Sequence, residues 1–376
     1  MSNNSVLSLS CAEARRLAVA AQGLTEQSDL LTPLNILRHL GAIQLDAIQR
    51  VDKAHRLVCL ARASALKGRQ TLDDGLWSSS GPAAVFESWA HAVCLLPIED
   101  WPLWEFSRQR TEKARWAPPA TVCDRLINLV RDQGPMTIRQ LEAGAVKSSG
   151  WNWSETKTAA EFLVWTGGLI CAERKGSQRI YDLPERRIPS HLLNKQLSET
   201  QSLATLVSRA AQAYGVATVS DLTEYFRLTR KDVESVVAEI GLIRANVEGW
   251  TDPAWVHPSM INIPSSVTQP VFLTPFDNLI WDRERTRRLF GFSYTFEAYK
   301  PAAKRQYGYY VTPLLVEGSI IGRADLTREG NDLVALAAYY ESQDMRNEQA
   351  LMQAGWRLAM QLGCDEFRVV RESFGT

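Results

Sequence analysis

The sequence predicts an α+β fold, and observations in different parts of the chain indicate it. From about residue 121, three helices followed by a β-ribbon occur twice in the same order. Beyond about Pro264 the composition shifts to aromatic and β-branched strands followed by one helix. The 376 residues, 45% of them hydrophobic, are enough to bury a large core. We expect three tandem winged helix-turn-helix modules and a small β-barrel-like C-terminal domain.

The modules are assigned from helical and strand periodicity, and their boundaries follow from turns and linkers. Residues 119–190 and 195–264 form the two clear copies, and 1–118 a more divergent one that contains a strand-like stretch at 83–97. The ribbon of the first clear copy turns at Lys175 and Gly176. The C-terminal domain, 265–376, has predicted strands at 270–281, 292–299, 307–316, 319–326 and 366–371 and a helix at 348–361.

The first fifty residues contain clear helix boundaries. Ser10 and Glu13 form a capping box, and Thr32-Pro33 begins a second helix that Gly41 ends. The segment IQLDAI that follows alternates apolar and polar residues, which is typical of an extended chain. Gln44 and Asp46 therefore lie on one face of it.

Composition excludes several classes of protein. No CxxC pair occurs among the six cysteines, and the five histidines have no HExxH spacing, so we expect reduced, packed thiols and no metal site. Neither GxxxxGK[ST] nor GxGxxG is present, which argues against a nucleotide cofactor. No apolar window reaches membrane-spanning length, and we expect a cytoplasmic protein that needs no cofactor.

The partner indicated by the modules is double-stranded DNA, because winged helices place a helix in the major groove. Net charge is zero, so affinity must come from local patches. Between Trp281 and Tyr310 there are seven basic residues and three acidic ones. The basic residues are Arg283, Arg285, Arg287, Arg288, Lys300, Lys304 and Arg305. The alternative for the modules is that they act as a protein scaffold, and the alternative for the basic segment is that it is a solvated face without a ligand.

The pair Gln44 and Asp46 is the candidate for chemistry. Hydrolysis of an N-glycosidic bond passes through an oxocarbenium-like sugar, which a carboxylate stabilises while it deprotonates the attacking water. An amide two residues away on the same face can orient that water. Taken alone, Q-x-D is a weak signal, and a polar turn after a helix is the simpler interpretation.

Several segments together resemble one family. GAIQLDAI, ESWAHAVCLLP, TPFDNLIWDR and YKPAAKRQYGYYVTPLL followed by GRAD are similar to the AlkZ/YcaQ-type winged-helix DNA glycosylases. The resemblance covers nearly the whole chain and implies a catalytic Q-Φ-D triplet at Gln44, Leu45 and Asp46, as in the YcaQ-like branch. It also implies metal-free hydrolysis of bulky N7-alkylated purines, unhooking of interstrand DNA crosslinks and a shallow, open site. We expect the protein to be a monomer.

Further residues are secondary candidates. Lys175 at the wing and the run Lys304, Arg305, Gln306 and Tyr307 are expected to contact DNA, with a solvated hairpin tip as the alternative. Trp89 and His91 could line the site, but packing in the core is favoured. Lys53, the nearest lysine downstream of Asp46, has no desolvating context in the sequence, so we expect no lyase activity. A non-catalytic DNA-binding regulator is the rival function.

Overall fold

The capping box at Ser10 begins the first helix. The computed structural model describes residues 6–25, 30–143, 154–261 and 269–374. In it, Ser10 Oγ accepts the backbone N–H of Glu13, whose carboxylate accepts the N–H of Ser10. Helix α1 (Cys11–Ala21) follows, and Thr32 caps α2 (Pro33–Leu40) through its side chain. Both predicted helix starts are confirmed.

The chain divides into two compact units. The larger unit contains residues 1–73 together with 207–376, and the smaller unit contains residues 74–206. Two helices, α4 (Arg69–Asp74) and α11 (Glu199–Tyr214), cross from one unit to the other. The segment that joins α2 to α4 contains the short strand β2 (Ile43–Gln44) and α3 (Ala54–Arg62).

A four-stranded sheet in the larger unit contains the ribbon expected for residues 195–264. Its strand order is β1-β9-β10-β8. The bounds are β1 (Leu7–Leu9), β8 (Val216–Thr218), β9 (Ile243–Val247) and β10 (Ala254–Val256), with helices α12 (Val219–Tyr225) and α13 (Arg230–Glu234) and the turn η2 (Pro258–Met260). The N-terminal strand β1 pairs in parallel with β9, an addition that the sequence did not predict.

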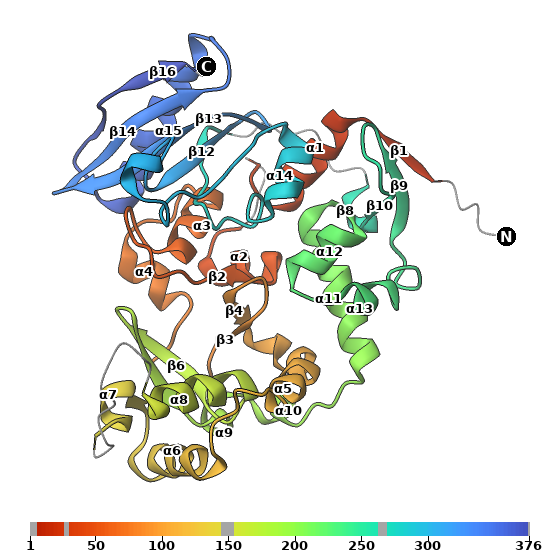
Figure 1. Ribbon diagram of the computed structural model, residues 1–376, viewed down its shortest axis with the longest axis vertical. Helices are drawn as coiled ribbons and strands as arrows, with labels where there is room; N and C mark the ends of the chain where they lie inside the picture. Colours follow the sequence, from red (N-terminus) through yellow and green to blue (C-terminus); the bar gives the residue numbers. More distant parts are fainter. Residues whose placement is uncertain (1–5, 26–29, 144–153, 262–268, 375–376) are drawn as a thin grey trace. The chain divides into compact units, whose positions relative to one another are not determined.

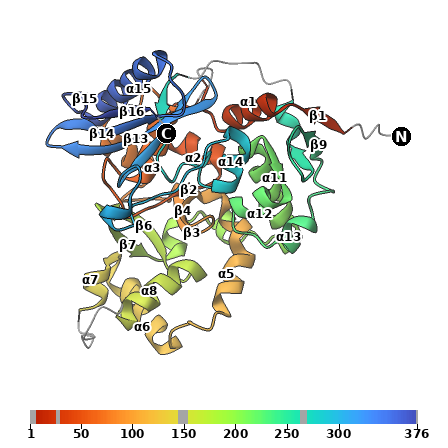
Figure 2. The same ribbon diagram turned by 45° about the horizontal axis from the view of Figure 1, so that its top comes forward.

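The C-terminal sheet of the larger unit is curled but open. Strands follow the order β11-β12-β13-β14-β15, and β16 also pairs with β14, so the expected barrel is a half-barrel (Figure 1). Bulges interrupt the pairing of β12 with β13 and of β13 with β14. Helix α15 packs on this sheet (Figure 2). The bounds are β11 (Val271–Phe272), α14 (Arg283–Phe290), η3 (Ala302–Lys304), β12 (Val311–Val316), β13 (Ser319–Glu329), β14 (Asp332–Tyr340), α15 (Arg346–Leu362), β15 (Phe367–Val369) and β16 (Glu372–Phe374).

The smaller unit contains the helices and hairpin expected for residues 119–190. Helices α6 and α8 pack together and both contact the hairpin of β6 and β7. Lys175 pairs with Gln178, so the turn lies at Gly176 and Ser177, one residue later than predicted. The bounds are β3 (Val85–Trp89), β4 (Val93–Pro97), η1 (Ile98–Trp104), α5 (Glu105–Glu112), α6 (Ala120–Gln133), β5 (Met136–Thr137), α7 (Ile138–Leu141), α8 (Glu155–Thr166), β6 (Ile170–Lys175), β7 (Gln178–Asp182), α9 (Pro184–Arg187) and α10 (Ser190–Leu193).

Several assignments made from the sequence are wrong or incomplete, including the strand expected at 270–281, of which only Val271–Phe272 is a strand. The stretch 83–97 is a hairpin of two strands, β3 and β4, and not one strand. Residues 292–299 form no strand, because tertiary contacts hold their aromatic side chains; Tyr294 Oη, for example, donates to the carbonyl of Val311 at 2.6 Å. The long strand β14 and the helix α14 were not predicted, since the first lacks polar alternation and the second is rich in arginine.

The six cysteines are all free, as expected. Four of them are buried, and the other two, Cys11 and Cys364, are half-buried. Burial raises the pKa of the Cys59 and Cys94 thiols to about 12, so both stay protonated and behave as small apolar side chains.

Candidate active site

Gln44 and Asp46 lie on the same side of the segment that follows α2. Gln44 ends β2, and its Nε2 donates a hydrogen bond of 3.3 Å to Asp46 Oδ2. The other carboxylate oxygen, Oδ1, accepts the backbone N–H of Ile48 at 2.8 Å. Both side chains are half-buried. The spacing read from the sequence thus brings an amide and a carboxylate into contact at a partly exposed position.

The surroundings of Asp46 make it a better proton acceptor. Desolvation raises the pKa of its carboxyl above the ordinary value of 3.8, and the hydrogen bonds from Ile48, Gln44 and Ala47 lower it. The net shift is upward, which strengthens the carboxylate as a base. Within the described parts of the chain, Gln44 Oε1 has no hydrogen-bond donor, so it is available to accept a hydrogen bond from a bound water.

Two buried side chains hold the backbone in front of the pair. Tyr225 Oη donates to the carbonyl of Leu40 at 2.6 Å, and Asn278 Nδ2 donates to the carbonyl of Ala42 at 2.9 Å. The residue between them, Gly41, has φ of +75°, a conformation in which a Cβ would be strained. The direction in which the chain enters Gln44 is therefore set from the interior of the larger unit.

The acidic residue of the TPFDN segment is structural. Both oxygens of Asp277 accept hydrogen bonds from Arg62, at 2.7 and 2.9 Å, and both side chains are fully buried. Arg62 also donates to the carbonyl of Gln22 at 2.8 Å. This bidentate pair connects the end of α3 to the segment that contains Asn278, so the motif holds the frame around Gln44 and Asp46.

An aromatic cluster made of Phe276, Phe296, Tyr299 and Tyr310 lies beside Asp46. Phe296 contacts the other three, with ring centroids 5.2, 6.0 and 6.1 Å away. Desolvation raises the pKa of Tyr299, and the charge of Asp46 raises it further, so phenol and carboxylate lie within electrostatic reach. Tyr299 is 79% exposed. Sequence reasoning missed this cluster because it assigned FSYTFEAY to a strand.

The polar residues around the start of α3 change the interpretation of Lys53. Lys53 is 7% exposed, so the expectation that nothing in its surroundings desolvates it is wrong. Its Nζ lies 3.7 Å from Asp73, which also accepts two hydrogen bonds from Arg56. A Schiff base requires a neutral amine, whereas a carboxylate partner favours the charged one. The pairing with Asp73 now argues against lyase chemistry.

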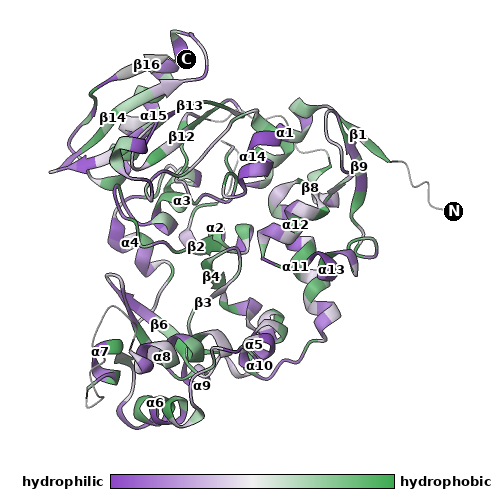
Figure 3. Cartoon of the chain, in the orientation of Figure 1, coloured by the Kyte–Doolittle hydropathy of each residue, from purple (hydrophilic) through white to green (hydrophobic). Residues whose placement is uncertain are grey.

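The basic segment between Trp281 and Tyr310 is not one surface patch. Figure 3 colours most of α14 as hydrophilic, yet all its arginines except the exposed Arg287 are buried or half-buried and have partners in the protein. Arg285 is 1% exposed and donates to the carbonyls of Tyr214 and Val216. The others donate as follows: Arg283 to the carbonyls of Pro275 and Ile280, Arg288 to Asp221, and Arg287 to Glu284. The sequence count overestimated the charge available to DNA.

The run from Lys304 to Tyr307 is held by one buried carboxylate. Glu297 Oε2 accepts the backbone N–H groups of Gln306 and Tyr307 at 2.9 and 2.8 Å, and Lys300 Nζ pairs with Oε1. Burial raises the pKa of Glu297, but these partners outweigh it and bring the pKa to about 2. Lys304 and Gln306 are exposed, whereas Arg305 and Tyr307 are half-buried. The four predicted DNA-contact residues thus share one anchored loop.

Trp89 is a surface residue of the smaller unit. It is 56% exposed, with its ring centroid 6.1 Å from that of Trp165, so the favoured interpretation as a core residue is wrong. His91 is half-buried in the turn between β3 and β4. An indole exposed at the end of a strand has a face on which a base or a sugar can stack.

Lys175 is exposed at the tip of the β6–β7 hairpin. Two arginines lower on the hairpin, Arg174 and Arg179, pair with the buried carboxylate of Glu87 at 2.6 and 2.7 Å. Their charges hold the hairpin to β3, which leaves Lys175 as a cation that can reach a ligand.

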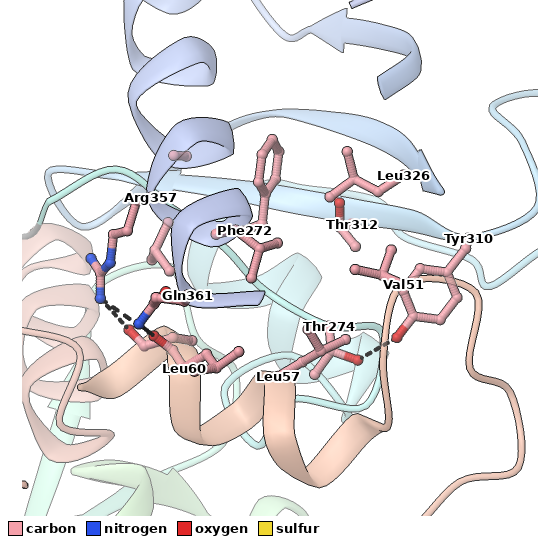
Figure 4. A pocket seen from close by; sticks show the side chains of 14 residues that line it. Val51, Leu57, Leu60, Phe272, Thr274, Tyr310, Thr312, Leu326, Arg357 and Gln361 are labelled. Atoms are coloured by element: carbon pink, nitrogen blue, oxygen red, sulfur yellow. Dashed lines mark hydrogen bonds between the residues drawn. The ribbon is translucent and has the colours of Figure 1, made fainter. Parts of the chain in front are cut away.

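The internal cavity shown in Figure 4 is too small for a base. Its volume is about 20 Å³, room for about one water. Tyr310 Oη and Thr274 Oγ1 are hydrogen-bonded at its edge at 2.9 Å, and Gln361 Nε2 donates to the carbonyl of Leu60 at 3.2 Å. The cavity belongs to the packing of α15 against α3.

Neither a metal centre nor a membrane span is evident in the described chain. In its four ranges, no three His, Cys, Asp or Glu side chains gather closely enough to hold a metal ion. No helix within the same ranges combines the length and the apolar character required to cross a membrane.

The chain is similar to known DNA glycosylases in sequence and in fold. The family model described as DNA glycosylase AlkZ-like matches residues 37–360, a range that includes Gln44, Asp46 and the aromatic cluster. The fold is that of the Streptomyces sahachiroi DNA glycosylase AlkZ, with a TM-score of 0.66 at 16% sequence identity over 97% of this chain and 100% of that chain. The chain therefore belongs to the AlkZ-like family of DNA glycosylases.

Proposed function

We propose that this chain is a monofunctional DNA glycosylase that removes bulky N7-alkylated purines and unhooks interstrand crosslinks, with Asp46 as the base and Gln44 as the residue that orients the water. The observation that carries the proposal is the contact between Gln44 Nε2 and Asp46 Oδ2 near the exposed side chain of Tyr299, in a chain of this family.

The chemistry requires little of the protein because an N7-alkylated purine is already a cation. The bond from C1′ to N9 breaks and its electron pair goes to the base, which leaves neutral. Asp46 stabilises the resulting oxocarbenium-like sugar and accepts a proton from the water whose oxygen bonds to C1′. Gln44 Oε1 accepts the second hydrogen of that water and holds it in line.

The same features favour a general repair enzyme over a dedicated one. Asp46 at the third position of the triplet supports membership of the Q-Φ-D, YcaQ-like branch. Asp46 is half-buried and Tyr299 is exposed, and neither lines the small internal cavity, which suits adducts too large for a closed pocket. A base tethered to the opposite strand by a crosslink also requires an open site, because it cannot enter a closed pocket.

DNA binding is assigned to three winged helix-turn-helix modules, residues 1–118, 119–190 and 195–264, with 265–376 as the C-terminal half-barrel domain. The helix-and-ribbon order of the second and third modules supports this assignment. Lys175 at one hairpin tip, and Lys304, Arg305, Gln306 and Tyr307 on the anchored loop, contact phosphates. Trp89 and His91 contact the strands near the lesion.

Single-turnover excision of N7-methylguanine from a duplex, read as abasic sites cleaved by alkali, tests the proposal. We expect Asp46→Asn to lower the rate at least about a hundredfold, because the amide has neither charge nor basicity. Gln44→Ala removes only orientation and is expected to have the smaller effect. Asp124→Asn, an exposed carboxylate on α6, is the matched control and keeps the rate.

The outcomes separate the enzyme from its rival. A near-normal rate in Asp46→Asn would exclude the assigned base. If the wild type produces no abasic sites but selects particular sequences from random duplexes, the chain is a regulator, because a lesion glycosylase reads phosphates and shape with little base readout. A crosslinked duplex run in parallel shows whether unhooking accompanies excision of the single adduct.

A further inference from the structure

A hollow of about 550 Å³ opens in the larger unit next to the segment that contains Asp46. Its lining includes three arginines and three tyrosines that come from four separate parts of the chain. They are Arg50, Arg305, Arg371, Tyr307, Tyr309 and Tyr339. Such a combination of guanidinium groups and aromatic rings is suited to an anion that has a flat, apolar neighbour.

The positive charges of this hollow are not neutralised by the fold. Among the described residues, no carboxylate pairs with any of the three arginines. Arg371 Nη2 donates to Tyr339 Oη at 2.9 Å. The Arg305 guanidinium lies 4.9 Å from the ring centre of Tyr309 and donates to the uncharged carbonyls of Glu297 and Lys300. Arg50 is exposed, and in the described part of the chain its side chain makes no hydrogen bond.

The one acidic side chain in the lining is already used. Asp325 accepts the backbone N–H groups of Tyr309 and Tyr310, at 3.1 and 2.8 Å, and is 7% exposed. A Cβ on Gly308 would lie 2.2 Å from Asp325 Oδ2, so the glycine is required for this close approach. Together with Glu297, Asp325 fixes the loop that presents Arg305 and Tyr307 before any ligand binds.

The hollow and the candidate active site are neighbours. Arg50 follows Asp46 by four residues in the same segment, and its carbonyl accepts the N–H of Arg328 at 3.4 Å. Tyr299 is influenced electrostatically by both Asp46 and Tyr309, so it is near the carboxylate and near one residue of the hollow's lining. A nucleotide whose sugar faces Asp46 therefore has a phosphate close to these arginines.

We propose that this hollow is a phosphodiester subsite for the DNA strand that carries the damaged nucleotide. Arg50 and Arg371 hold the phosphate oxygens, Arg305 adds its charge, and the three tyrosines pack against the adjoining sugar and base. Guanidinium groups bind phosphates through paired N–H donors, and phosphate contacts position the protein without reading sequence. The proposal rests on the proposed function for the identity of the strand.

Binding of an N7-methylguanine duplex by Arg50→Gln and Arg371→Gln tests the subsite. Every protein also carries Asp46→Asn, so that the lesion stays intact. We expect each substitution to weaken affinity roughly tenfold, the effect of one charge-assisted hydrogen bond. The slope of log K against log salt should fall by about 0.9 for each phosphate that the variant no longer neutralises. Arg368→Gln, an exposed arginine that pairs with Glu329, is the matched control and keeps both values.

A scan with single neutral methylphosphonates locates the bound phosphate. A methylphosphonate at one phosphate next to the lesion should weaken DNA binding by the parent protein. The same replacement should not weaken DNA binding by Arg50→Gln or Arg371→Gln any further. Unchanged affinity and salt slope in both variants would overturn the proposal, as would additive effects at every phosphate. The assay does not involve cleavage: a glycosylase that fails to excise can still show the subsite, and an active glycosylase can lack it.

Discussion

Two arginine-rich regions of this chain, helix α14 and the hollow beside Asp46, carry similar charge but use it in opposite ways. The α14 arginines donate to carbonyls or pair with carboxylates, and Arg285 is almost completely buried. In the hollow, Arg305 also donates to the carbonyls of Glu297 and Lys300, but neither it nor Arg50 nor Arg371 has a carboxylate partner among the residues described. What predicts a nucleic-acid contact is therefore the set of partners that each cation already has, not the number of cations in a segment.

Two carboxylates show the same contrast. Glu297 is engaged by Lys300 and by backbone N–H groups, which bring its pKa to about 2 although burial opposes this. For Asp46, desolvation exceeds the effect of three weaker hydrogen-bonding partners, and the pKa is raised. The Glu297 carboxylate stabilises a loop, whereas the Asp46 carboxylate is the one proposed to react. Substitutions can test this division between charges that have partners in the protein and charges that are available to a ligand.

The largest effect is expected at Arg285. Replacing it by Met removes the donor to the buried carbonyls of Tyr214 and Val216 and should reduce the free energy of unfolding by about 3 kcal/mol. Urea unfolding measures this reduction. Arg50→Gln, the counterpart in the hollow, should change stability by less than about 0.5 kcal/mol. Equal effects of the two substitutions would contradict the comparison.

A smaller effect is expected at Glu297. Glu297→Gln should cost about 2 kcal/mol at neutral pH, because it removes the ionised acceptor of Lys300 and the N–H groups. Since folding lowers this pKa, its contribution is complete above the ordinary value of 4.5 and disappears as the pH falls toward 2. Unfolding measured from pH 6 to pH 3 should show the wild type approaching the variant; a constant difference would exclude an ionic role.

The reactive carboxylate should appear in the pH dependence of excision. In the proposed mechanism Asp46 acts in its ionised form, so the single-turnover rate should fall about tenfold per pH unit below its pKa. Because desolvation raises that pKa, the decline should begin above the ordinary value of 3.8. Rates are corrected for spontaneous depurination with duplex alone. A rate that stays level down to pH 4 would show that Asp46 is not the base.

Local signals predicted the parts of the fold that depend on neighbouring residues. The capping box at Ser10, the Thr32–Pro33 start and the hairpin of β6 and β7 were recognisable because a few adjacent residues determine them. The pair Gln44 and Asp46 also came from local alternation. Its assignment to catalysis came only from a resemblance to a family.

Long-range contacts explain what the sequence did not predict. Strand β1 pairs with β9 more than two hundred residues later, and no local pattern encodes such pairing. The alternating aromatic residues of 292–299 are typical of a strand, but in the structure Phe296 from this segment contacts Phe276 and Tyr310. The hollow is equally non-local, since Arg50 and Arg371 come from opposite ends of the larger unit's sequence.

The smallest effect is expected at Arg287, and it is the sharpest check on the division of charges. Arg287 lies in α14, but it is exposed and its only carboxylate partner in the described chain is the exposed Glu284. Arg287→Gln should change stability by less than about 0.5 kcal/mol, because exposed ion pairs contribute little. If engaged charges are not used for DNA, the salt slope of duplex binding should also stay constant. A slope reduced by about one unit would make α14 a second phosphate-binding element and would restore the sequence-based basic patch at that residue.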